Sequence, residues 1–146
     1  MIIKEPKWKS WIVETTTPLF TPEQCQKIID CGRRQQPQKA QVGMGEPEGG
    51  LDTKKRTTTI SWIPFKEMPE MYADLNNFIQ RANLNHFGFG DIQVTENAQF
   101  TEYPVGGFYD WHMDCDINMT HEPPVRKISM TLLLNHESQF EGGELE

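Results

Sequence analysis

Apolar residues recur at helical spacing between Pro69 and His86, and this stretch carries the clearest periodic pattern of the chain. They stand three and four residues apart, at Tyr72, Leu75, Phe78, Ile79 and Ala82. Side chains at those steps lie on one face of an α-helix. The pattern therefore predicts a helix whose apolar stripe packs against a core.

A second helix is predicted to begin after Thr21. Thr is a preferred N-cap residue, Pro22 fits the first helical position, and Gln24 can complete a capping box. We expect this helix to end near Gly32.

Shorter β-prone runs account for most of the remaining pattern, and a polar, glycine-rich stretch separates two of them. Strands are predicted over 8–13, 56–63, 92–103, 108–114 and 127–134, with another beginning near Phe140. Residues 35–55 predict a long loop, which we interpret as a mobile lid. Helices that lead into several short strands favour an α+β fold. We expect one domain over 1–146, in which N-terminal helices buttress a double-stranded β-helix, or jelly roll.

Composition narrows the classes of partner. The chain has 146 residues and a net charge of −7, which disfavours a nucleic-acid partner. No apolar run has the length of a signal peptide core or a membrane span. Cys25 and Cys31 are expected to be reduced thiols. We therefore expect a soluble cytoplasmic protein that binds neither nucleic acid nor membrane.

The main candidate for chemistry is the pair His112 and Asp114. Side chains two residues apart on an extended segment point to the same side. One imidazole nitrogen and one carboxylate oxygen can thus reach a single cation. This donor set suits iron(II) held by two histidines and one carboxylate, with positions left open for a co-substrate and dioxygen.

Four segments together resemble a known enzyme family. The first is the run Tyr103-x-x-Gly106-x-x-Tyr109-x-x-His112-x-Asp114, and the others are Arg126–Asn135, Phe140–Leu145 and the earlier strand Arg56–Trp62. Their order and spacing resemble the prolyl 4-hydroxylase-like branch of the iron(II)- and 2-oxoglutarate-dependent dioxygenases. The resemblance spans roughly residues 15–146 and is most specific in the last third.

The resemblance implies a function and a role for each matching residue. It implies that His112 and Asp114 are the catalytic metal ligands, and that iron(II) uses 2-oxoglutarate and dioxygen as co-substrates, with ascorbate as a possible reductant. Residues implied to contact 2-oxoglutarate are Tyr103, Thr131, Leu133 and Leu145, and those implied to contact substrate are Tyr109 and Arg126. Ser129, Thr131 and Leu133 alternate onto one face of their predicted strand. The third iron ligand, the basic residue for 2-oxoglutarate and the last core strands would follow Glu146.

The leading interpretation is hydroxylation of an unactivated carbon, on a prolyl residue of a peptide or protein. A free amino acid or another small molecule is an alternative substrate. A catalytically inactive jelly-roll binding module is a second alternative. A zinc hydrolase would need a complete ligand set that the sequence does not show. The oligomeric state stays open.

Overall fold

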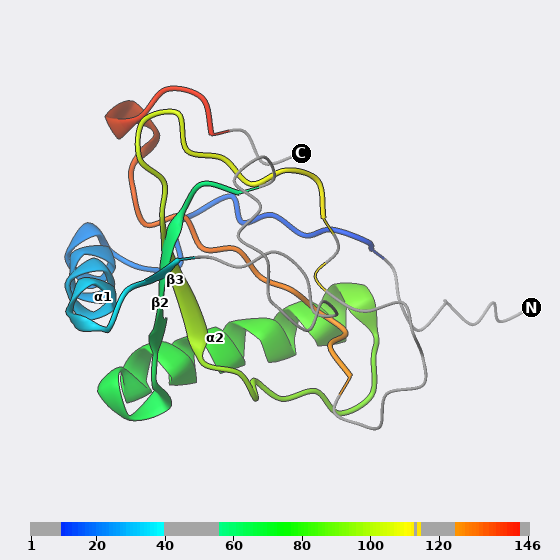
Figure 1. Ribbon diagram of the computed structural model, residues 1–146. Coiled ribbons are helices and arrows are strands. Elements are labelled where there is room, and N and C mark those ends of the chain that lie inside the picture. Colours follow the sequence, from blue (N-terminus) through cyan, green and yellow to red (C-terminus); the bar gives the residue numbers. More distant parts are fainter. Residues whose placement is uncertain (1–9, 40–55, 113, 115–124, 144–146) are drawn as a thin grey trace, which may run out of the picture.

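The computed structural model describes residues 10–39, 56–112, 114 and 125–143. These residues contain two α-helices and one small antiparallel sheet (Figure 1). The helices are α1 (Pro22–Arg34) and α2 (Pro69–Ala82), and the strands are β1 (Gln38–Lys39), β2 (Thr59–Ile63) and β3 (Ala98–Glu102). Short turns of helix occupy Phe65–Glu67, Asn83–Phe87 and Glu137–Gln139. The strands pair antiparallel in the order β1-β2-β3, and the β2–β3 register runs from Thr59 opposite Glu102 to Ile63 opposite Ala98.

Helix α1 begins as its sequence predicts. The Thr21 hydroxyl accepts a hydrogen bond from the Gln24 backbone N–H at 3.3 Å, and the Gln24 side chain accepts from the Thr21 backbone N–H at 2.8 Å. This reciprocal pair is the predicted capping box. The helix ends at Arg34, two residues beyond the expected end at Gly32.

A glycine lets α1 approach the sheet. A Cβ atom on Gly32 would lie 2.3 Å from Cγ of Phe100 in β3, so only a residue without a side chain fits there. The Ser61 hydroxyl of β2 donates to the Gly32 carbonyl at 2.7 Å. Cys31, which is fully buried, completes the contact. One face of the sheet is thereby fixed to α1.

Helix α2 supplies the other large part of the core. Tyr72 and Leu75 of the predicted stripe are buried, together with Met71, which the pattern did not include. The other members of the stripe, Phe78, Ile79 and Ala82, are half-buried. The Tyr72 hydroxyl donates to the Ile63 carbonyl at 2.5 Å and accepts from the Ala98 N–H at 2.6 Å, which ties the helix to the paired ends of β2 and β3. A π-helical turn continues the helix to Phe87, where Gly88 ends it at φ 70°. Among the described residues, no helix has the length and apolar character needed to cross a membrane.

Several predicted strands are wrong for the residues that the structure describes. The runs 56–63 and 92–103 contain β2 and β3, but 10–13, 125–134 and 140–143 form no strand, and within 108–114 only Tyr109 makes a bridge, to Arg56. A strand needs a partner at hydrogen-bonding distance, and an alternating pattern does not specify one. The predicted loop 35–55 includes β1, while 40–55 lies outside the described residues. The described residues form one three-stranded sheet, which does not test the predicted jelly roll, so that fold stays a prediction.

Candidate functional site

A glycine turn after β3 brings the candidate ligands back alongside β2. Thr59 pairs with Glu102, and Arg56 pairs with Tyr109. From one pair to the other, the segment before β2 advances by three residues, whereas the segment after β3 advances by seven. The extra residues form a turn in which the Gly107 N–H donates to the Pro104 carbonyl at 2.7 Å. Gly106 adopts φ +74°, a conformation that favours glycine. The chain then pairs again, with the Thr57 N–H donating to the Phe108 carbonyl at 2.9 Å.

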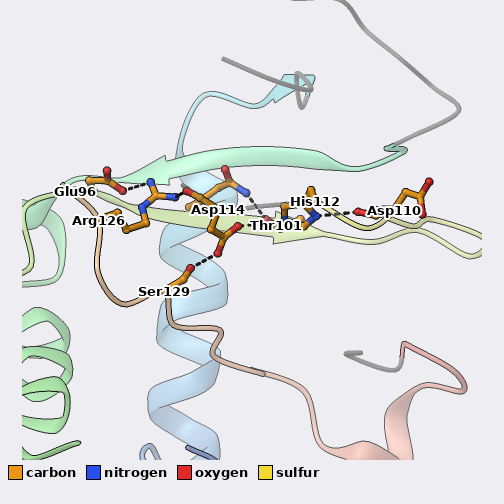
Figure 2. A network of polar contacts seen from close by, with 8 residues as sticks. Glu96, Thr101, Asp110, His112, Asp114, Arg126 and Ser129 are labelled. Atoms are coloured by element: carbon orange, nitrogen blue, oxygen red, sulfur yellow. Dashed lines mark hydrogen bonds and ion pairs between the residues drawn. The ribbon is translucent and has the colours of Figure 1, made fainter. Parts of the chain in front are cut away.

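His112 and Asp114 lie together where this segment leaves the sheet (Figure 2). His112 Nε2 is 3.2 Å from Asp114 Oδ1, and the two side chains are 36% and 45% exposed. His112 Nδ1 lies 2.8 Å from the Asp110 carbonyl oxygen. A carbonyl can only accept, so Nδ1 carries a proton, and in the neutral ring Nε2 then presents a lone pair. Two acceptor atoms this close need a proton or a metal cation between them.

Asp114 is held by two further contacts, which Figure 2 marks as dashed lines to Arg126 and Ser129. The Ser129 hydroxyl donates to Asp114 Oδ2, and Arg126 Nη1 donates to the Asp114 backbone carbonyl. Arg126 Nη2 also pairs with Glu96 Oε2 at 2.5 Å. The carboxylate is therefore fixed through its second oxygen and its backbone, which leaves Oδ1 facing His112.

His112 is supported by an aromatic stack. Its ring lies on the Tyr109 ring with centroids 3.5 Å apart and planes 14° apart. The Arg56 guanidinium carbon is 4.2 Å from the centroid of the same tyrosine ring. Arg56 is only 8% exposed, and its Nε donates to the Thr58 hydroxyl at 2.8 Å. Arg56, a buried residue three positions before β2, thus supports the tyrosine on which the imidazole rests.

The donor atoms fit a metal cation in part. Two adjacent ligands of an octahedral ion with bonds of about 2.1 Å lie about 3 Å apart, close to the 3.2 Å between Nε2 and Oδ1. Metal-binding histidines usually donate their other N–H to a carbonyl or carboxylate, and ligating carboxylates are themselves hydrogen-bonded. His112 and Asp114 have both kinds of support. Within the described part of the chain, no group of three or more His, Cys, Asp and Glu side chains could hold a metal.

The other predicted site residues occupy different surroundings. Tyr103 is 54% exposed and directly follows β3. Residues 128–134 alternate, with Met130, Leu132 and Leu134 packed against the core and Ser129, Thr131 and Leu133 exposed. The face that carries Thr131 and Leu133 is thus the face from which Ser129 reaches Asp114. Leu145 lies outside the described residues.

Three residues of this site had no role assigned from the sequence: Arg56, Glu96 and Ser129. Arg56 opens the matching strand-like run 56–62, and Ser129 lies on one face of the alternating run 127–134, but neither pattern predicts the contacts that these two residues make. Glu96 carries no local signal, since its contact with Arg126 joins positions 30 residues apart. Burial of Arg56 is the unusual feature, because arginine is seldom buried without a charged partner.

Comparisons with protein-family models, with curated proteins and with solved structures found no match to this chain.

Proposed function

We propose that the protein is an iron(II)- and 2-oxoglutarate-dependent dioxygenase that hydroxylates an unactivated carbon. The observation that carries this proposal is the pair of donor atoms, His112 Nε2 and Asp114 Oδ1, at 3.2 Å, with the remaining polar atom of each side chain already engaged. Such engagement fixes the tautomer and orientation that a metal ligand needs. The choice of iron(II) rests on the resemblance of the run Tyr103–Asp114 to the prolyl 4-hydroxylase-like dioxygenases and on the nitrogen and oxygen donors of the pair.

The residues of the chain would divide the work as follows. His112 and Asp114 would hold the metal. Iron(II) with 2-oxoglutarate and dioxygen would supply the oxidant, which lies beyond the chemistry of amino-acid side chains. The phenol of Tyr103 would donate a hydrogen bond to the co-substrate without adding charge. Thr131, Leu133 and Leu145 would line its pocket.

We propose a prolyl residue of a peptide or protein as substrate. Tyr109 supports this, since the family resemblance implies that it contacts the prolyl residue and its ring lies against His112, the proposed metal ligand. Arg126 does not add to this support, because its guanidinium contacts Glu96 and the Asp114 backbone carbonyl rather than an open substrate position. The free thiols Cys25 and Cys31 support our placing the protein in the reducing cytoplasm.

A turnover assay on the full-length protein tests the proposal. We expect succinate to form only with iron(II), 2-oxoglutarate and oxygen together, with one atom of labelled dioxygen entering a proline-containing peptide. His112→Ala should abolish the reaction, whereas His86→Ala, which removes an exposed histidine of the π-helical turn, should preserve it. Absence of iron-dependent succinate from the wild-type protein would contradict the proposal and favour a binding module. Labelled oxygen in a free amino acid, and none in the peptide, would overturn the substrate class alone.

A further inference from the structure

The pair Glu96 and Arg126 lies beside a proposed metal ligand and takes no part in the predicted iron coordination. We propose that this pair is a clamp that positions Asp114 for metal binding, so that Arg126 acts on the metal ligand rather than on substrate. The inference rests on the proposed function, because it concerns the same site. It assigns a role to Glu96, which lies outside the motif.

The hydrogen bonds of Arg126 define the clamp. Nη1 donates to the Asp114 backbone carbonyl, and Nη2 pairs with Glu96 Oε2 at 2.5 Å (Figure 2). The guanidinium is a rigid planar fork, so fixing one acceptor fixes the direction in which the other nitrogen points. These contacts use two of the five N–H donors of the guanidinium and fix its orientation beside Asp114.

The clamp completes the fixation of the Asp114 carboxylate. Ser129 holds Oδ2, and Arg126 holds the backbone carbonyl of the same residue. The Ser129 contact limits rotation of the side chain, and the Arg126 contact limits movement of the backbone from which the carboxylate projects. Loss of either contact would let Oδ1 move out of line with His112 Nε2. Glu96 keeps the guanidinium in place, because a charge-assisted contact orients it from the side opposite Asp114.

The location of the three segments explains why such a clamp is needed. Glu96 lies just before β3, Asp114 follows the glycine turn after β3, and Arg126 precedes the extended segment that packs on the core. No strand ladder among the described residues holds Asp114, since regular pairing ends at the Arg56–Tyr109 bridge. Side-chain contacts therefore take over the positioning.

The clamp should affect metal binding more than stability. Arg126 and Glu96 are 33% and 60% exposed at their side chains, and pairs this exposed add little to folding. Loss of a residue that orients a metal ligand commonly weakens metal binding by about 10-fold to 100-fold. Glu96→Gln should accordingly leave a folded protein with a weaker metal site.

Calorimetric titration of the full-length protein with iron(II), under anaerobic conditions, tests the clamp. Variants are Glu96→Gln, Arg126→Gln, the double variant and Arg126→Lys, whose ammonium lacks the planar fork. The matched control is the pair Arg33 and Glu102, also an exposed arginine and carboxylate, joined at 2.7 Å away from the site. Substituting Arg33→Gln or Glu102→Gln changes the same charges.

We expect each single substitution in the clamp to weaken iron binding about tenfold. The double variant should bind iron with an affinity no lower than that of the single variant that binds less tightly. The control variants should bind as wild type. Wild-type iron affinity in Glu96→Gln, combined with a raised KM for peptide in Arg126→Gln, would overturn the clamp and restore the substrate role of Arg126. A wild-type protein that binds no iron would overturn the proposed function itself, and the clamp with it.

Discussion

The phenol ring of Tyr109 lies flat against the imidazole of His112, with centroids 3.5 Å apart and planes 14° apart. Arg56 lies 4.2 Å from the centroid of the same ring. Two groups so close to one ring must occupy its opposite faces, since neither leaves room for the other. Tyr109 is thus held between the buried Arg56, which precedes β2, and His112, the proposed metal ligand.

This stack predicts that ring contact at Tyr109, rather than its hydroxyl, positions His112. Tyr109→Phe keeps both faces and should retain iron affinity, whereas Tyr109→Ala frees the imidazole to rotate and should weaken binding about tenfold. Anaerobic iron(II) titration measures both variants. Equal affinity in Tyr109→Ala and wild type would show that the stack has no positioning role.

The glycine turn predicts a steric requirement at Gly107. A Cβ atom there would lie 2.7 Å from Pro104 Cδ, 2.8 Å from the Pro104 oxygen and 3.0 Å from the Thr57 oxygen, and two of these three neighbours are backbone. Gly107→Ala should therefore disturb the turn, lower the urea midpoint and weaken iron binding. Gly90→Ala is the matched control, because a Cβ atom at Gly90 meets nothing within 4 Å. Similar losses in both variants would contradict this explanation.

The hydroxyl of Tyr72 predicts a stability effect without any change at the site. Tyr72→Phe leaves the Ile63 carbonyl and the Ala98 N–H without their shared partner. Each unsatisfied buried group costs about 1–3 kcal/mol, so urea denaturation should show a loss in that range or above. Tyr103→Phe, at a tyrosine that is 54% exposed, should change stability little. Equal stability of Tyr72→Phe and wild type would refute the role of this hydroxyl.

The same residue predicts a dependence on alkaline pH. Burial raises the pKa of Tyr72 above its ordinary value. The folded state then resists ionisation, so the associated stability is complete below the ordinary tyrosine pKa of about 10 and is lost as pH rises through the folded pKa. The stability difference between wild type and Tyr72→Phe should therefore shrink as pH is raised above about 10. Urea midpoints measured across that range would show it, and a constant difference would contradict it.

Local signals predicted the helices well. The capping box at Thr21 and the apolar stripe through Tyr72 and Leu75 depend on neighbours within one or two turns, and both are confirmed. The strand β2 was also predicted, because its run of β-prone residues ends at Pro64. The alternation of 128–134 was read correctly as two faces.

Features that depend on distant partners could not be predicted from the pattern. The segment 128–134 alternates as a strand would, yet strand assignment requires ladder hydrogen bonds that its sequence cannot specify. The contact of Arg126 with Glu96 joins residues 30 apart, and that of Ser129 with Asp114 joins residues 15 apart. The spacing of His112 and Asp114 predicted that their side chains point to the same side and can reach one cation, and their Nε2 and Oδ1 atoms lie 3.2 Å apart. Their metal remains a proposal.

The most direct measurement is anaerobic titration of the full-length protein with iron(II) and 2-oxoglutarate, monitored through the visible charge-transfer band of the complex. The band should saturate at one iron per chain in the wild type, vanish in Asp114→Ala, and persist in Asp91→Ala, which removes an exposed carboxylate away from the site. A wild-type band that survives Asp114→Ala undiminished, or a wild-type protein without any band, would contradict a metal site at His112 and Asp114.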